Sequence, residues 1–128
     1  MIYLDSSVAL AQLLAETRSP PESLGDEQLV SSRLLEYEVW SRIHVRGFGR
    51  SHQAEVRELL ARVDMLAMSD AVLARALEPF PMPLRTLDAL HLSTIEFLRS
   101  QGDSVELASY DNRLIAAARA LGISIVEL

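Results

Sequence analysis

The stretch Ile2-Tyr3-Leu4-Asp5-Ser6-Ser7 is a short apolar run that ends at an acid and two serines. The apolar residues 8–14 follow directly, and this order predicts a buried strand, a cap and a helix. The same order returns at residues 105–109, where a second apolar run is followed by Asp111 at the start of another helix. Strands that alternate with helices in this way predict a parallel sheet covered on both faces.

The rest of the chain extends this pattern. Further strands are predicted at residues 28–31, 65–68 and 123–126, and the helix predicted over 33–45 has a core stripe of Leu35, Val39 and Ile43. The other predicted helices span 51–62, 71–78 (capped by Ser69-Asp70) and 86–99 (capped by Thr86 and closed by Gly102), and a last one runs from Asp111 to Gly122. With about five strands in all, we expect an α/β fold in a single domain over residues 1–128.

Composition excludes several classes of protein. The 128 residues include no cysteine, which excludes disulfides and sulfur-ligated zinc. No apolar run reaches the roughly 18 residues of a membrane span, and no basic segment of the kind found in secretory signals precedes the first apolar run. We therefore expect a cytoplasmic protein with no membrane contact.

The net charge is −6, and all 12 basic residues are arginines. This balance excludes a protein that binds nucleic acid through bulk positive charge. It does not exclude a polyanionic substrate, because a metal site built from several of the acids would offset most of the excess. Arginine also has a planar fork of donors that suits phosphate, although genome bias explains the absence of lysine equally simply.

Four acids stand where a site could form. Asp5 and Asp111 each follow a predicted strand, and ligands of open parallel sheets bind beyond the carboxyl ends of the strands. Asp88 lies in the first turn of its helix, and Glu38 lies beside an apolar stripe. Each acid also has a simpler explanation: a helix cap for the first two, a complement to the helix dipole for Asp88, and an ion pair with Arg42 for Glu38. Spacing alone does not decide between these explanations.

Four segments of the chain closely resemble, in order, the four motifs of VapC-type PIN domains. They are Ile2-Tyr3-Leu4-Asp5-Ser6-Ser7, Ser32-Arg33-Leu34-Leu35-Glu36-Tyr37-Glu38-Val39, Leu84-Arg85-Thr86-Leu87-Asp88-Ala89-Leu90-His91-Leu92 and Ala108-Ser109-Tyr110-Asp111-Asn112-Arg113-Leu114. Each motif of that family contributes one acid, and the matching positions here are Asp5, Glu38, Asp88 and Asp111. Glu36 and Tyr37 depart from the family, which more often has basic or small apolar residues there.

The resemblance implies a PIN-like three-layer α/β/α sandwich and a metal-dependent endoribonuclease. Its four carboxylates would bind Mg²⁺ or Mn²⁺, since both ions prefer oxygen ligands. We expect Ser6 and Thr86 to support the acids or to cap helices, and Arg42, Arg46, Arg85 and Arg113 to contact RNA phosphates or to form ordinary surface ion pairs. The histidines at 44, 52 and 91 share no ligand spacing and are interpreted as structural or surface residues.

The resemblance also implies two partners, an RNA substrate and a VapB-like antitoxin. We further expect a homodimer, because small domains with this much apolar content often bury a self-complementary patch. A surplus of apolar residues on the helices near the acids could form a groove for an antitoxin helix: Leu10, Leu13, Leu14, Val39, Trp40 and Ile43. Trp40 could anchor that helix or belong to the core.

Three alternatives remain. A phosphoryl-accepting regulatory module also places acids above a parallel sheet, but such modules use a lysine that this chain lacks. A non-catalytic PIN scaffold would have no need of all four acids. A PIN nuclease of RNA processing or DNA cleavage stays open, although the small size favours a toxin. A short antitoxin gene upstream would discriminate between these two.

Overall fold

Five parallel strands form one sheet: β1 (Ile2–Leu4), β2 (Leu29–Ser32), β3 (Val63–Leu66), β4 (Glu106–Ala108) and β5 (Ser124–Ile125). Their order across the sheet is β3-β2-β1-β4-β5. The structure is a computed structural model, and it describes residues 1–14 and 19–128. The helices are α1 (Ser6–Leu13), α2 (Leu34–Val45), α3 (Gln53–Ala61), α4 (Asp70–Ala76), α5 (Thr86–Ser100) and α6 (Asn112–Ala120), with a 3₁₀ turn η1 at Glu22–Asp26.

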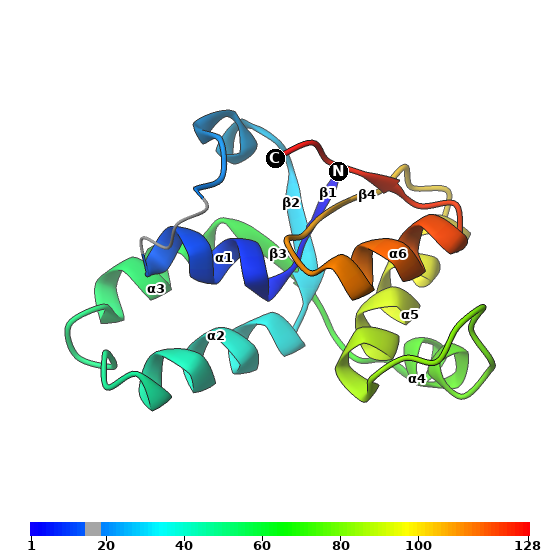
Figure 1. Cartoon of the computed structure of the whole chain (residues 1–128), viewed down its shortest axis with the longest axis horizontal. Coiled ribbons are helices and arrows are strands. Elements are labelled where there is room, and N and C mark those ends of the chain that lie inside the picture. The colour runs from blue at the N-terminus through cyan, green and yellow to red at the C-terminus, as the bar shows by residue number, and fades with distance from the viewer. Residues whose placement is uncertain (15–18) are drawn as a thin grey trace.

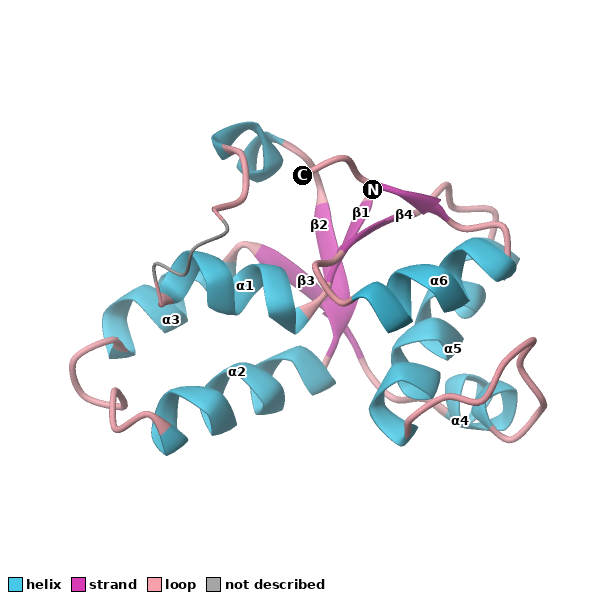
Figure 2. Ribbon diagram, viewed as in Figure 1, coloured by secondary structure: helices cyan, strands magenta, loops and turns pink. Residues whose placement is uncertain are grey.

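The two faces of the sheet are covered by different helices (Figures 1 and 2). Side chains alternate along a strand, so Ile2 and Leu4 pack in one core with α1, α2 and α3, while Tyr3 packs in the other with α5 and α6. The helix α4 packs against α5. This arrangement confirms the predicted three-layer α/β/α fold with a parallel sheet.

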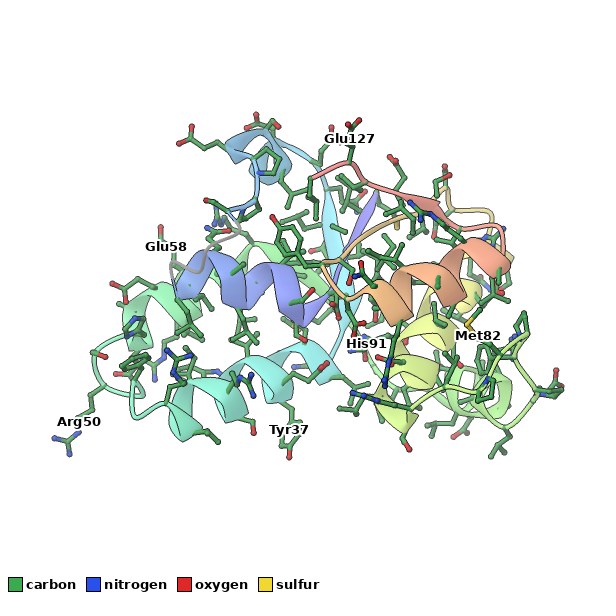
Figure 3. The ribbon with its side chains drawn as sticks, viewed as in Figure 1. Tyr37, Arg50, Glu58, Met82, His91 and Glu127 are labelled. Carbon is green, nitrogen blue, oxygen red and sulfur yellow. The ribbon has the colours of Figure 1, made fainter. Side chains whose placement is uncertain are left out.

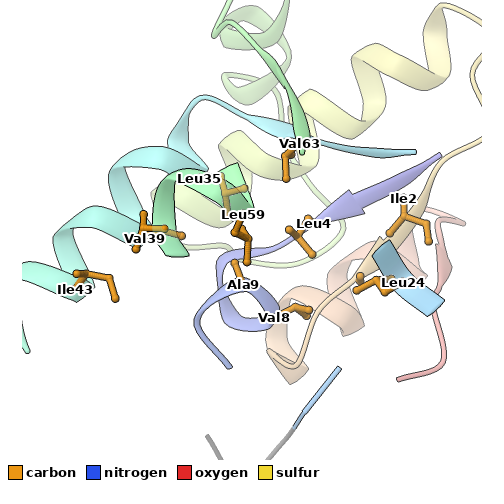
Figure 4. Close-up of a cluster of buried hydrophobic side chains, with 12 residues drawn as sticks. Ile2, Leu4, Val8, Ala9, Leu24, Leu35, Val39, Ile43, Leu59 and Val63 are labelled. Carbon is orange, nitrogen blue, oxygen red and sulfur yellow. The ribbon is translucent and has the colours of Figure 1, made fainter. Parts of the chain in front are cut away.

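The core stripe predicted for α2 is confirmed. Leu35, Val39 and Ile43 are fully buried and lie in the cluster shown in Figure 4, together with Leu4 and Val63 of the sheet. The packing of this face against the sheet fixes the position of α2. The opposite face of the helix therefore has a defined place relative to the sheet, at the edge of the molecule.

One strand is shifted and one predicted cap is wrong. The third strand is confirmed but starts at Val63, two residues before the predicted start, because Val63 already pairs with Leu29 of β2. Thr86 does not cap α5: Arg85 has extended backbone angles (φ −71°, ψ 156°) and holds the cap position, so Thr86 is the first helical residue. Ser69 caps α4 as predicted, by accepting a hydrogen bond from the amide of Val72.

The strand order creates a crevice at the carboxyl edge of the sheet. After β1 the chain builds β2 and β3 on one side, then returns to place β4 and β5 on the other side. Ligands of open α/β sheets bind at such a reversal. The amide of Asp5 donates to the carbonyl of Ala108 at 3.0 Å, which joins the ends of β1 and β4 at this point. Within the described part of the chain, no helix is long and apolar enough to cross a membrane.

Candidate active site

An open cleft of about 950 Å³ lies at this edge, and the four predicted acids all line it. Asp5 comes from the end of β1, Glu38 from α2, Asp88 from the first turn of α5 and Asp111 from the loop after β4. Four segments that are distant in sequence therefore contribute one carboxylate each to a single cleft.

Asp5 is buried and held by hydroxyl groups. Its Oδ2 accepts hydrogen bonds from Ser7 Oγ (2.6 Å), Ser109 Oγ (2.8 Å) and, more weakly, the amide of Ser7 (3.4 Å). Among the described residues, no hydrogen bond reaches Oδ1 of Asp5. One oxygen of this carboxylate thus fixes its orientation, while the other remains available to a ligand. Asp5 also caps α1, so the cap explanation holds together with its place in the cleft.

Asp111 is tied to the same hydroxyl. Its amide donates to Ser109 Oγ at 2.9 Å, and its own Oδ1 caps α6 by accepting from the amides of Arg113 (2.9 Å) and Leu114 (3.4 Å). The Ser109 side chain therefore connects the two acids that follow neighbouring strands.

Glu38 is held by two side chains across the cleft wall. Ser6 Oγ donates to its Oε2 at 3.0 Å, and His91 Nε2 donates to its Oε1 at 2.5 Å. The Glu38–Arg42 pair considered from the sequence does not occur among the described residues, where the recorded partners of Glu38 are Ser6 and His91.

His91 continues this contact into the core (Figure 3). Its Nδ1 lies 2.7 Å from the hydroxyl of buried Tyr3, which in turn accepts from the amide of Ser32 at 3.2 Å. Burial acts to lower the pKa of His91, but the hydrogen bond and charge of Glu38, with the charges of Asp5 and Asp88, raise it above its usual value. Burial also raises the pKa of Tyr3, which keeps its hydroxyl neutral. Glu38 is thus oriented from inside the protein.

Asp88 shows that negative charge is concentrated in the cleft. Its pKa is raised first by burial and then by the charges of Asp111 and Asp5, which outweigh the opposing effects of His91 and Arg85. Such mutual repulsion is the expected consequence of carboxylates that share a site without a cation.

The chemistry of these donors fits a hard divalent cation. Carboxylate oxygens are the usual ligands of Mg²⁺ and Mn²⁺, and Asp5, which lines the cleft, has one oxygen that accepts no hydrogen bond from the described residues. Within residues 1–14 and 19–128, no group of three or more acidic or histidine side chains is arranged to hold a metal ion by itself. Mg²⁺ commonly binds through one or two carboxylates and retains several waters, so the donor set suits an ion of that kind.

The structure places some of the predicted supporting residues and arginines in the cleft and others outside it. Ser6 lies in the cleft and contacts Glu38, whereas Thr86 is exposed and lies outside it. Of the four arginines, Arg42, Arg46 and Arg85 line the cleft. Arg113 lines a neighbouring cavity instead, with Arg85.

Of the apolar residues expected near the acids, one lines the cleft and the others belong to the core. Leu10 lines the cleft, while Val39 and Ile43 are fully buried and Leu13, Leu14 and Trp40 are half-buried against the core. Trp40 stacks on His44, with ring centroids 5.5 Å apart. The exposed apolar side chains of the cleft are Tyr37, Val45 and Leu87, which the sequence pattern did not single out.

Sequence reasoning missed the residues that hold the acids in place: Ser7, Ser109, His91 and Tyr3. Two signals were available. Ser109 follows β4 directly, just as Asp5 follows β1, and His91 lies three residues after Asp88, which places both on neighbouring positions of one helix face.

The family pattern described as "PIN domain" matches residues 2–120. Ribonuclease VapC35 of Mycobacterium tuberculosis is 36% identical over 132 residues, covering 98% of this chain and 96% of the relative. Ribonuclease VapC46 of the same species is 35% identical, covering 98% and 95%. A solved structure titled "Toxin-antitoxin complex from Klebsiella pneumoniae" has the same fold, with a TM-score of 0.70 at 17% identity over 99% of this chain and 97% of that one. The chain therefore belongs to the PIN domain family, and within it to the VapC-type proteins.

The raised pKa of Asp88 leads to a prediction for the metal-free protein. Because burial, and after it the charges of Asp111 and Asp5, raise this pKa above its usual value of 3.8, the stability associated with the protonated carboxyl is present below that pH and is lost as pH rises through the raised pKa. We expect Asp88→Asn, which cannot ionise, to have a higher free energy of unfolding than the wild type at neutral pH in EDTA. The difference should shrink as pH falls toward 3.8.

Urea denaturation at both pH values measures this effect. The control is Asp26→Asn, since Asp26 is exposed on η1 and lies outside the cleft. Equal gains for the two variants would mean that net charge, and not crowding in the cleft, causes the change.

Proposed function

We propose that this protein is a metal-dependent endoribonuclease, the toxin of a VapBC-type toxin–antitoxin pair, which hydrolyses phosphodiester bonds of RNA in the cytoplasm. The observation that supports this most is the meeting of four carboxylates from four elements in one cleft of a VapC-type PIN domain. The relatives that match nearly the whole chain are named ribonucleases, which supports the choice of RNA.

Asp5, Asp88 and Asp111, with Glu38, would hold Mg²⁺ or Mn²⁺, one or two of them directly and the others through waters that the ion retains. When bound, the ion would supply an activated water and stabilise the charge that develops on the phosphate. The chain itself supplies positioning: Ser7 and Ser109 orient Asp5, while Ser6 and His91 orient Glu38. Positioned groups of this kind account for much of the rate of phosphoryl-transfer enzymes.

The metal site is tested by Asp5→Asn. This change preserves shape but removes the charge of the carboxylate with a free oxygen, so we expect loss of RNA cleavage by at least about a hundredfold and weaker Mn²⁺ binding by calorimetry. Excess EDTA should stop the wild type, and added Mg²⁺ or Mn²⁺ should restore it. Wild-type rates in Asp5→Asn, with Asp26→Asn as control, would disprove the site.

RNA affinity is proposed to come from a few arginines at the cleft. The support is the net charge of −6, together with the position of Arg42 and Arg46 along the wall formed by α2. Each phosphate contact on a single strand adds about 0.7 to the slope of log K against log salt.

We expect the double variant Arg42→Ala, Arg46→Ala to bind a single-stranded oligoribonucleotide more weakly and with a shallower salt slope, while Mn²⁺ affinity is unchanged. The matched control is Arg50→Ala, Arg57→Ala, which changes net charge equally at exposed positions outside the cleft (Arg50 is labelled in Figure 3). Fluorescence anisotropy across a salt series measures both. Equal slopes for the two variants would contradict a local contact.

We propose two protein contacts on separate surfaces. The exposed Tyr37, Val45 and Leu87 give the acidic cleft an apolar rim, which would suit an antitoxin helix that carries an arginine toward the acids. The exposed Leu73 and Leu77 on and after α4 would suit a homodimer contact, since Leu77 is 89% exposed.

These surfaces predict opposite behaviour of two variants. Leu77→Glu should lower the mass of the chain from dimer to monomer in light scattering and still co-purify with the product of the adjacent antitoxin gene. Val45→Glu should remain dimeric and lose the antitoxin. The two-surface arrangement would be refuted if one variant abolished both the homodimer and the antitoxin complex. It would also be refuted if neither variant changed either assembly.

A further inference from the structure

A second cavity of about 570 Å³ adjoins the acidic cleft, and we call it the flanking pocket. Its apolar walls are Met82, Pro83 and Leu84, from the loop before α5, and Ala116 on α6. Figure 3 shows Met82 in this loop, beside α6. The flanking pocket shares Arg85 and Asp88 with the cleft, so the two cavities lie side by side.

Polar groups stand at the rim of these apolar walls. Asn112 and Arg113 are exposed on the first turn of α6, and Arg85 is exposed at the start of α5. Among the described residues, none of these three side chains has a hydrogen bond or a salt bridge. An apolar pocket with a few uncommitted donors is the usual form of a small-ligand site.

We infer that the flanking pocket binds the base of a nucleotide next to the cleaved phosphate and so acts as a base-binding subsite. This inference rests on the proposed nuclease function and names a further binding site for its substrate. A nucleobase has apolar faces for Met82, Leu84 and Ala116, and a polar edge for Asn112 or the two arginines. A base held there is unstacked, which a duplex does not permit without opening.

The position of Arg113 supports a base contact over a phosphate contact. Arg42 and Arg46 lie on the wall of the cleft away from the flanking pocket, where the phosphates at one end of the RNA strand would pass. Arg113 lies beyond Asp88, beside apolar walls, and shares that pocket with Arg85. One strand could therefore run from α2 across the acids, and its next base would enter the flanking pocket.

The test is to fill the flanking pocket with a larger side chain. Ala116→Leu adds bulk at an exposed helical position that lines it, and Ala120→Leu adds the same bulk one turn later on α6, outside it. The probe is a short single-stranded oligoribonucleotide, with versions that carry one abasic nucleotide at each position in turn. Circular dichroism and thermal melting check that both variants fold.

We expect one abasic position to lower kcat/KM of the wild type about tenfold, the lower end of the range for one lost apolar contact in a binding pocket. Ala116→Leu should show a similar loss with the intact probe and no further loss with that abasic probe, while Ala120→Leu behaves as the wild type. Binding without cleavage is measured in the Asp5→Asn background, to which each leucine change is added. The fluorescence anisotropy of the intact probe should then show weaker binding for Ala116→Leu than for Ala120→Leu.

Each outcome bears on a different claim. Equal kinetics and binding for the two leucine variants, or tolerance of abasic nucleotides at every position, would overturn the flanking pocket and leave the nuclease intact. RNA binding that Ala116→Leu weakens, without cleavage by the wild type, would support the pocket and refute the nuclease. Absence of both binding and cleavage would overturn both. Loss of antitoxin binding alone in Ala116→Leu would assign the pocket to a protein side chain and overturn the base site.

Discussion

The hydroxyl of Ser109 holds together the two acids on which the cleft depends. It donates to Asp5 at 2.8 Å and accepts from the amide of Asp111 at 2.9 Å, from a buried position at the end of β4. A serine can do both at once because its oxygen accepts while its proton is donated. The parallel pairing of β1 and β4 brings these groups into register, and α1 and α6 then extend from the two acids as caps. The sheet, the first turns of α1 and α6, and the cleft are thus connected through the hydrogen bonds of one hydroxyl group.

Crowding of carboxylates has a cost that the surrounding residues offset. Burial, and then repulsion from the neighbouring acids, raises the pKa of Asp88, whereas Asp5 and Glu38 each accept hydrogen bonds from hydroxyl or imidazole groups. The His91–Tyr3 contact extends this support into the core on the α5 side of the sheet. Strain concentrated at a functional site and compensated by its surroundings is a common feature of enzymes.

The sequence predicted the parts of the fold that repeat a local pattern. The stripe of α2 and the strands that precede Asp5 and Asp111 follow from periodicity and order, and the structure has them. The convergence of four acids in one cleft came from resemblance to the family, since no local pattern encodes contacts between distant segments. His91 was interpreted as structural or surface, and the structure shows it buried; its contact with Glu38, 53 residues away, depends on where the fold places α5 relative to α2. The cap at Arg85 was missed because backbone angles, and not residue preference, decide it.

The pairing of β1 with β4 also makes assembly of the cleft depend on two distant parts of the chain. Ser109 lies 104 positions after Asp5, and its hydrogen bond to Asp5 forms only when β4 has paired with β1. Contacts of such long sequence separation require the closure of a long loop and are slow to form. A folding intermediate with β4 unpaired therefore keeps Ser7 as a local partner of Asp5 but lacks Asp111 beside it, so it has no assembled cleft.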